Sequence, residues 1–190
     1  MSRKLLIVDT ETGGLDPAHN PILSIAALVW NQGGIEDQYY TLVNVGGEMR
    51  VEDQALKVNG LSVEQIKAEG VSPLQAANAI RAMLQKNDMR RDVRICAHNA
   101  PFDVSFVKQL WTLASLDYKK TFSYRSLCTQ TGALLLEQAG RVELPGGSAS
   151  LDNLVKLWEI KLDRSGGHNA LDDAHACAEV LRRELWLIGG

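Results

Sequence analysis

The chain has 190 residues, which is enough for one well-buried domain. Its hydrophobic content of 45% is ordinary for a globular protein, and no apolar run reaches the length of a membrane span. The net charge of −3 excludes nucleic-acid binding by bulk positive charge, so nucleic acid would have to be held locally. Three widely separated cysteines and a start without a signal peptide predict a cytoplasmic protein with reduced thiols.

Residues 1–45 predict three consecutive strands with antiparallel pairing. Residues 5–8 form a short apolar, β-branched run typical of a buried strand, and residues 22–30 form a longer one. The segment Asn31-Gln32-Gly33-Gly34 has the composition of a hairpin turn and leads into a third strand over residues 38–45. Short helices are expected after this hairpin, over residues 54–58 and 63–67.

The remainder of the chain predicts helices that alternate with short strands. Ser72, Pro73 and Gln75 have the types and spacing of a capping box, which begins a helix that extends to Lys86. Further strands are expected over residues 93–97 and 122–128, and further helices over residues 101–113, 130–138, 151–158 and 169–188. The order of elements predicts one α/β domain over residues 1–190, with a mixed sheet covered by helices.

Two carboxylates at alternate positions follow the first apolar run. Because successive strand side chains point to opposite faces, Asp9 and Glu11 point the same way. Two neighbouring anions repel each other unless a cation lies between them, and hard divalent cations take carboxylate oxygens. The pair therefore indicates either a metal site or a solvated strand end.

Two later segments carry further acidic side chains at the starts of helices. Asp103 follows a strand, at the edge where open α/β sheets bind ligands, although an acid in a first helical turn also favours the helix dipole. Asp173 lies on the flank of the apolar face of the last helix, and His168 precedes that helix after two glycines. His168 alone also fits a helix cap or a surface histidine. Asp172 is expected to be exposed and His175 to be non-catalytic.

Together these residues resemble the histidine branch of the DEDD exonuclease superfamily, which includes epsilon-type proofreading subunits, ribonuclease T and oligoribonuclease. The first family motif, Asp-x-Glu-Thr-x-Gly-Leu, matches residues 9–15, and the second, His-Asn-x-x-Phe-Asp, matches residues 98–103. The third motif, a histidine with an aspartate five positions later, matches His168 and Asp173. The resemblance covers nearly the whole chain, although Asn59-Gly60-Leu61 stands where many relatives carry His-Gly-Ile.

The resemblance implies a ribonuclease-H-like fold and removal of nucleoside 5′-monophosphates from 3′ ends. It implies that four carboxylates hold two divalent ions, Mg²⁺ or Mn²⁺, with Asp9 bridging both and with Glu11, Asp103 and Asp173 completing the coordination. It also implies that His168 is the general base, a role that suits histidine because its side chain titrates near neutral pH.

The same resemblance implies a set of substrate contacts: Thr12, Gly13, Gly14, Leu15, His98, Asn99 and Phe106. Leu15 would pack against a base, although simple core packing also fits it. His98 and Asn99 would line the pocket unless they only shape the turn in which they lie. Phe106 lies about one helical turn after Asp103 and either stacks on a base or belongs to the core.

Three functions fit these observations. The first is a 3′→5′ exonuclease on single-stranded DNA, RNA or both, and the second restricts the same chemistry to RNA trimming or short oligoribonucleotides. The third is an inactive module that binds nucleic acid or protein, which intact acidic ligands and a poised histidine argue against. Because the chain ends soon after the last helix, we expect a free-standing nuclease and not an obligate polymerase subunit. Some members of the resembled family dimerise, and a homodimer remains open for this chain.

Overall fold

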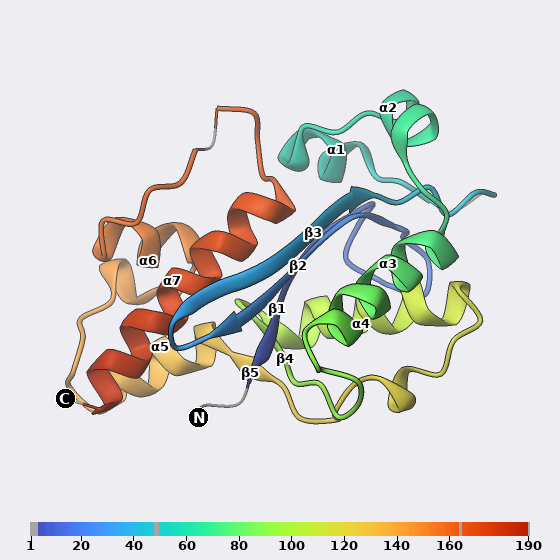
Figure 1. The fold of residues 1–190 in the computed structure, drawn as a ribbon. Helices are drawn as coiled ribbons and strands as arrows, with labels where there is room; N and C mark the ends of the chain where they lie inside the picture. Colours follow the sequence, from blue (N-terminus) through green and yellow to red (C-terminus); the bar gives the residue numbers. More distant parts are fainter. Residues whose placement is uncertain (1–3, 48–49, 164, 190) are drawn as a thin grey trace.

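A five-stranded mixed sheet forms the centre of the computed structural model, which describes residues 4–47, 50–163 and 165–189 (Figure 1). The strand order is β3-β2-β1-β4-β5. β1 (Leu5–Thr12), β2 (Ile22–Asn31) and β3 (Gly34–Leu42) pair antiparallel, whereas β4 (Ile95–Ala97) and β5 (Leu127–Cys128) extend the sheet in the direction of β1. β1 therefore lies in the middle of the sheet, and the predicted mixed sheet is confirmed.

Helices cover both faces of this sheet (Figure 1). The α-helices of the described ranges are α1 (Asp53–Asn59), α2 (Val63–Glu69), α3 (Pro73–Lys86), α4 (Ala100–Leu113), α5 (Thr129–Gln138), α6 (Leu151–Leu157) and α7 (Ala170–Gly189), and the 3-10 helices are η1 (Tyr118–Lys120) and η2 (Pro145–Gly147). α3 and α4 lie on one face, whereas α7 lies on the other with α5 and α6 packed against it. Within these described helices, none combines the length and apolar character needed to cross a membrane.

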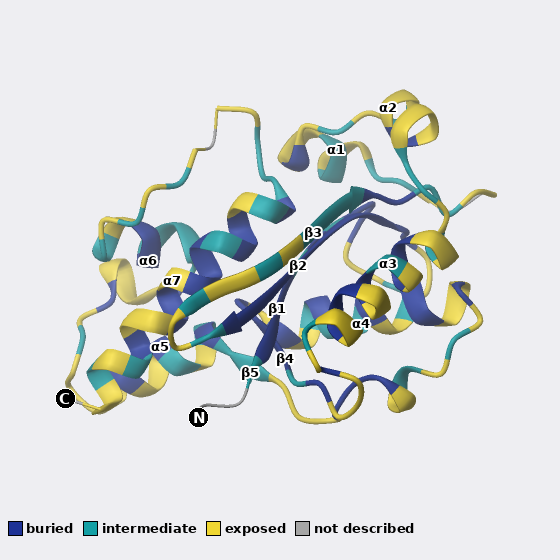
Figure 2. Cartoon of the chain, viewed as in Figure 1, coloured by how far each residue is buried: buried dark blue, intermediate teal, exposed yellow. Residues whose placement is uncertain are grey.

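The two central strands are buried on both faces (Figure 2). Leu6 and Val8 of β1 belong to the core under α3 and α4, whereas Leu5 and Ile7 belong to the core under α7. Because side chains alternate along a strand, the odd-numbered positions that follow Ile7 continue on the α7 side. This alternation places the acidic positions of β1 opposite the first turn of α7.

The boundaries of the helices agree with the predictions more closely than the boundaries of the edge strands do. The capping box at the start of α3 is formed by Ser72 and Gln75. β3 begins at Gly34, well before residue 38, because the tight turn already pairs Asn31 with Gly34. The strand predicted over residues 122–128 is regular only in β5, because residues 124–126 are exposed and leave the sheet after a bridge between Phe122 and Val93.

Candidate active site

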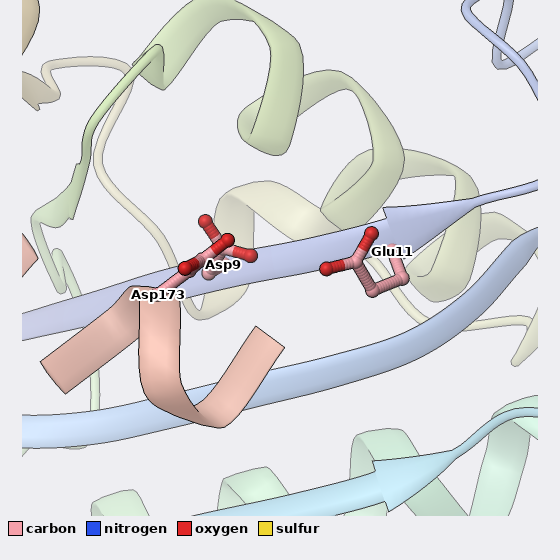
Figure 3. A group of neighbouring side chains, drawn as sticks. All are labelled: Asp9, Glu11 and Asp173. Carbon is pink, nitrogen blue, oxygen red and sulfur yellow. The ribbon is translucent and has the colours of Figure 1, made fainter. Parts of the chain in front are cut away.

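Three carboxylates meet where β1 passes the first turn of α7. Asp9 and Glu11 lie on the same side of β1, and Asp173 reaches toward them from α7 (Figure 3). One oxygen of each of the three carboxylates lies within 4.8 Å of the others. Asp173 is only 4% exposed. This spacing of carboxylate oxygens fits a hard divalent cation.

Asp103 supplies a fourth carboxylate from the first turn of α4. Pro101 occupies an early position of this helix, where a backbone N–H has no hydrogen-bond partner within the helix, so its lack of an N–H costs nothing. The helix brings Asp103 to the carboxyl end of β4. The carboxylate is 4% exposed, and the Thr10 hydroxyl donates to its Oδ1 at 3.0 Å. Asp103 thus lies beside the trio of carboxylates but outside the 4.8 Å group.

If all four carboxylates were ionised in this site, they would lose hydration and repel one another. Burial, followed by the charges of Asp103, Asp173 and Glu11, raises the pKa of Asp9 well above its ordinary value. Burial also raises the pKa of Asp103 to about 7, although the hydrogen bond from Thr10 opposes the rise. A divalent cation among the carboxylates would offset both the lost hydration and the mutual repulsion. The donor set and its electrostatics therefore fit a metal site.

His168 joins the carboxylates from the loop that precedes α7. Its Nδ1 lies 3.2 Å from Oδ2 of Asp173, and its side chain is 40% exposed. A carboxylate oxygen of Asp173 can accept this hydrogen bond from Nδ1–H, which leaves the lone pair of Nε2 free to take a proton. The backbone N–H of His168 donates to the carbonyl of Val58 in α1 at 3.0 Å.

A cavity of about 250 Å³ contains these groups. Its walls are formed by Asp9, Thr10, Glu11, His98, Asn99, Phe102, Asp103, Ser150, Leu151, Asp152, His168 and Asp173. The predicted acids and histidine therefore share one cavity. Phe102 and the start of α6 also line the cavity, although neither was predicted as a site residue. The start of α6 reaches the cavity only through the tertiary packing of the folded chain.

The glycine segment after β1 contacts protein and does not line this cavity. An added Cβ at Gly13 would lie 2.7 Å from the Pro21 ring, and one at Gly14 would collide with Asn20. The Thr12 hydroxyl donates to the carbonyl of Gly14 at 2.7 Å. Leu15 is 82% exposed, which excludes the core-packing alternative for its side chain.

One predicted substrate contact requires correction, and a second has a structural role in addition to its place in the cavity wall. Phe106 is 0% exposed and packs in the core under α3 and α4, so its ring offers no face to a base. Phe102, whose ring centroid is 5.0 Å from that of Phe106, is the aromatic residue that lines the cavity. Both ring nitrogens of His98 are engaged within the protein, by the Thr129 hydroxyl at 3.0 Å and the Ala149 carbonyl at 2.9 Å. Burial lowers the pKa of His98, so the ring is a neutral brace between β4, α5 and the loop before α6.

Two neighbours of the site lie where the sequence predicted. Asp172 is exposed, and its side chain is absent from the walls of the cavity. His175 lies on another side of α7 and contacts Gln38 of β3 through Nε2 at 2.9 Å. Asp172 and His175 therefore serve as reference positions for substitutions in this helix.

Comparison with known proteins assigns the class of this site. A family model for exonucleases of the RNase_T type matches residues 6–181. The chain belongs to this exonuclease family, within the DEDD exonuclease superfamily, and is a hydrolase of the exonuclease class. It is 30% identical over 183 residues to DNA polymerase III subunit epsilon of Rickettsia typhi, a match that covers 94% of this chain and 72% of the relative. It is 29% identical to a PolC-type DNA polymerase III of Thermotoga maritima, of which it covers only 12%.

Solved structures show the same fold. E. coli exonuclease I in complex with a dT13 oligonucleotide superposes with a TM-score of 0.79 at 17% identity, over 96% of this chain and 41% of that protein. This likeness confirms the predicted ribonuclease-H-like α/β fold. The chain therefore spans less than half the length of exonuclease I. The exonuclease family depends on divalent metal ions, which agrees with the acidic cluster of β1 and α7.

Proposed function

We propose that this chain removes nucleotides one at a time from the 3′ end of single-stranded nucleic acid and releases nucleoside 5′-monophosphates. The observation that carries the proposal is the convergence of four carboxylates and His168 in one cavity. Single-stranded DNA is the favoured substrate, because relatives are named as DNA polymerase subunits and exonuclease I was solved with a dT13 oligonucleotide.

Asp9, Glu11 and Asp173, with Asp103 beside them, would hold two divalent ions, Mg²⁺ or Mn²⁺. When bound, such ions supply positive charge that favours an ionised attacking water and stabilises the charge on the leaving 3′ oxygen. The burial of Asp103 and Asp173 keeps their carboxylates fixed in the cavity wall. Fixed carboxylates need little rearrangement when charge develops during the reaction.

His168 takes the proton of the attacking water at Nε2. The Asp173 carboxylate accepts from Nδ1–H at 3.2 Å, which favours the tautomer with an unprotonated Nε2 and stabilises the imidazolium that forms. The water oxygen bonds to phosphorus, the bond from phosphorus to the 3′ oxygen breaks, and that oxygen takes a proton from solvent. The exposed edge of His168 then returns its proton to solvent.

The terminal nucleotide would lie against the cavity wall near Phe102 and Asn99, which line the cavity. Leu15, with 82% exposure at the end of the first motif, presents an apolar side chain that can pack on a base. His98 would act indirectly, by bracing the turn that carries Asn99.

A time course with 5′-labelled single-stranded DNA and RNA of equal sequence tests the proposal, in Mg²⁺, in Mn²⁺ and in EDTA. We expect a metal-dependent ladder that shortens from the 3′ end, and the rates on the two substrates give the sugar preference. Asp173→Asn should abolish the ladder, whereas Asp172→Asn, the exposed neighbour, should retain it. Intact substrate under both metals with folded protein would contradict the proposal and favour a binding module.

A further inference from the structure

The short helix α1 contacts both the segment at the end of β1 and the loop that contains His168. At its start, the backbone N–H of Glu52 donates to the carbonyl of Gly13 at 2.7 Å. At its end, the amide of Asn59 donates to the carbonyl of Thr12 at 3.4 Å, and this side chain is 5% exposed. α1 is thus attached at both ends to the segment that directly follows Glu11.

The end of α1 also contacts the backbone of the loop before α7 (Figure 1). The N–H of His168 donates to the carbonyl of Val58 at 3.0 Å. An added Cβ at Gly167 would lie 3.0 Å from that same carbonyl and 3.1 Å from the nitrogen of Gly60. An added Cβ at Gly60 would collide with the carbonyl oxygen of Gly166. We call this set of contacts between residues 58–60 and 166–168 the α1–loop contact.

Glycine is required on both sides of the α1–loop contact. Gly60 ends α1 with φ of +66° and Gly167 has φ of +93°, in the region of backbone conformation that side chains disfavour. Each of the two glycines also lies against backbone atoms, which cannot move aside as a flexible side chain can. A methyl group at either position would therefore displace the loop from α1.

The ring of His168 has few other restraints. Its side chain is 40% exposed, and its one hydrogen bond to a side chain among the described residues is the contact with Asp173. The position of the ring therefore depends on where the backbone of the loop lies. We propose that the α1–loop contact, through Gly60 and Gly167, is a positioning element that holds His168 over the carboxylates. This inference rests on the proposed role of His168 as general base.

Gly60→Ala tests the inference, with Gly140→Ala as the matched control. Gly140 has nearly the same φ, +67°, but an added Cβ there would meet open space. We expect Gly60→Ala to lower kcat roughly 10–100-fold, since small misplacement of a catalytic group has effects of this size, with KM and the Mg²⁺ concentration for half-maximal activity little changed. Gly140→Ala should keep the wild-type kcat and pH profile. Gly167→Ala, with its milder contacts, provides a second variant if Gly60→Ala does not fold.

A double-mutant cycle identifies the residue through which Gly60 acts. If the α1–loop contact serves to position His168, Gly60→Ala in a His168→Ala background should cost almost no further activity. The same fold-loss in both backgrounds, or wild-type kcat in folded Gly60→Ala and Gly167→Ala, would overturn the inference. Full turnover in the single variant His168→Ala would show that His168 is not the general base. That result would contradict the proposed mechanism, and is thus distinguishable from a failure of the positioning inference.

Discussion

The hydroxyl of Thr10 donates to Oδ1 of Asp103 at 3.0 Å, which joins β1 to the first turn of α4 inside the active-site cavity. Thr10 lies between Asp9 and Glu11, so its side chain leaves β1 on the other side of the strand. The same strand thereby supplies two carboxylates directly and holds a third through a hydrogen bond. The bond also opposes the rise that burial causes in the pKa of Asp103.

Thr10→Val should lower kcat/KM by roughly tenfold, because a buried hydrogen bond to a charged group is worth about 1.5–3 kcal/mol. Without the donor, the pKa of Asp103 rises above about 7, so the acid limb of the pH–rate profile should move to higher pH. Steady-state kinetics across pH at subsaturating Mg²⁺ measure both effects, because a bound cation itself lowers the pKa of neighbouring carboxyls. Thr41→Val is the control, since the Thr41 hydroxyl bonds to the Leu42 carbonyl away from the cavity. A profile identical to wild type would show that Asp103 does not depend on Thr10.

Metal binding should offset the loss of stability that rising pH causes in the metal-free protein. The pKa values of Asp9 and Asp103 are raised in the folded protein, so without metal it binds more protons than the unfolded chain from about pH 4 upward. The free energy of unfolding in EDTA should therefore fall as the pH rises through neutrality, and Mg²⁺ should raise Tm most at the alkaline end. Thermal unfolding followed by circular dichroism measures this.

The corresponding variant is Asp9→Asn. It removes a group whose pKa is raised in the folded protein, so above about pH 4 it should raise Tm in EDTA, and it should shrink the gain in Tm from Mg²⁺. Asp172→Asn, an exposed neighbour of the cluster, should leave both quantities unchanged. An equal Mg²⁺ effect on wild type and Asp9→Asn would argue that the ion binds elsewhere.

The acidic cluster was predictable because its geometry is local or follows a family motif. The two-residue period of a strand places Asp9 and Glu11 on one face whatever packs against it. The packing of β1 on α7 then brings Asp173 to them, and the position of His168 before that helix follows from sequence spacing. Strand alternation and the family pattern were therefore enough to predict these residues.

The roles of His98 and Phe106 depend on tertiary packing that the sequence does not encode locally. The ring of His98 bonds to Thr129 and to Ala149, which are 31 and 51 residues away, so its structural role becomes visible only in the folded chain. Phe102 and Phe106 lie on the same side of α4, because they are one turn apart. Which of them faces the cavity depends on where α4 begins relative to β4.

The two phenylalanines should respond differently to substitution. Phe102 lines the cavity and packs on Phe106, so Phe102→Ala should raise KM for single-stranded DNA about tenfold, as expected for loss of a stacked base, and should also lower Tm. Phe106→Leu should leave KM unchanged but lower the free energy of unfolding by about 1 kcal/mol, because it alters a fully buried site. Kinetics and urea denaturation of both variants test the assignment. The opposite pattern would restore Phe106 as the substrate contact.

A further buried carboxylate lies on α7, far from the active site. Glu184 is 3% exposed, and its Oε1 has no hydrogen-bond partner among the described residues. Its Oε2 occupies the space above Gly132 of α5, where an added Cβ would lie 2.6 Å away. Burial, followed by the charge of Cys128, raises the pKa of Glu184 to about 8. The folded protein therefore holds a proton on Glu184 at pH values where the unfolded chain has lost it.

Glu184→Gln should stabilise the protein at alkaline pH and leave exonuclease activity unchanged. Between the ordinary value of 4.5 and about 8 the folded state binds the extra proton, so the wild type loses up to about 1.4 kcal/mol of stability per pH unit across this interval. Glutamine carries no charge, so its advantage should be near zero at about pH 4.5 and should grow to a few kcal/mol near pH 8. Urea denaturation across this range measures the difference. Glu179→Gln is the control, since Glu179 is exposed and pairs with Arg182, so its effect should stay below about 1 kcal/mol at every pH. A pH-independent difference between Glu184→Gln and wild type would mean that Glu184 is ionised in the folded state.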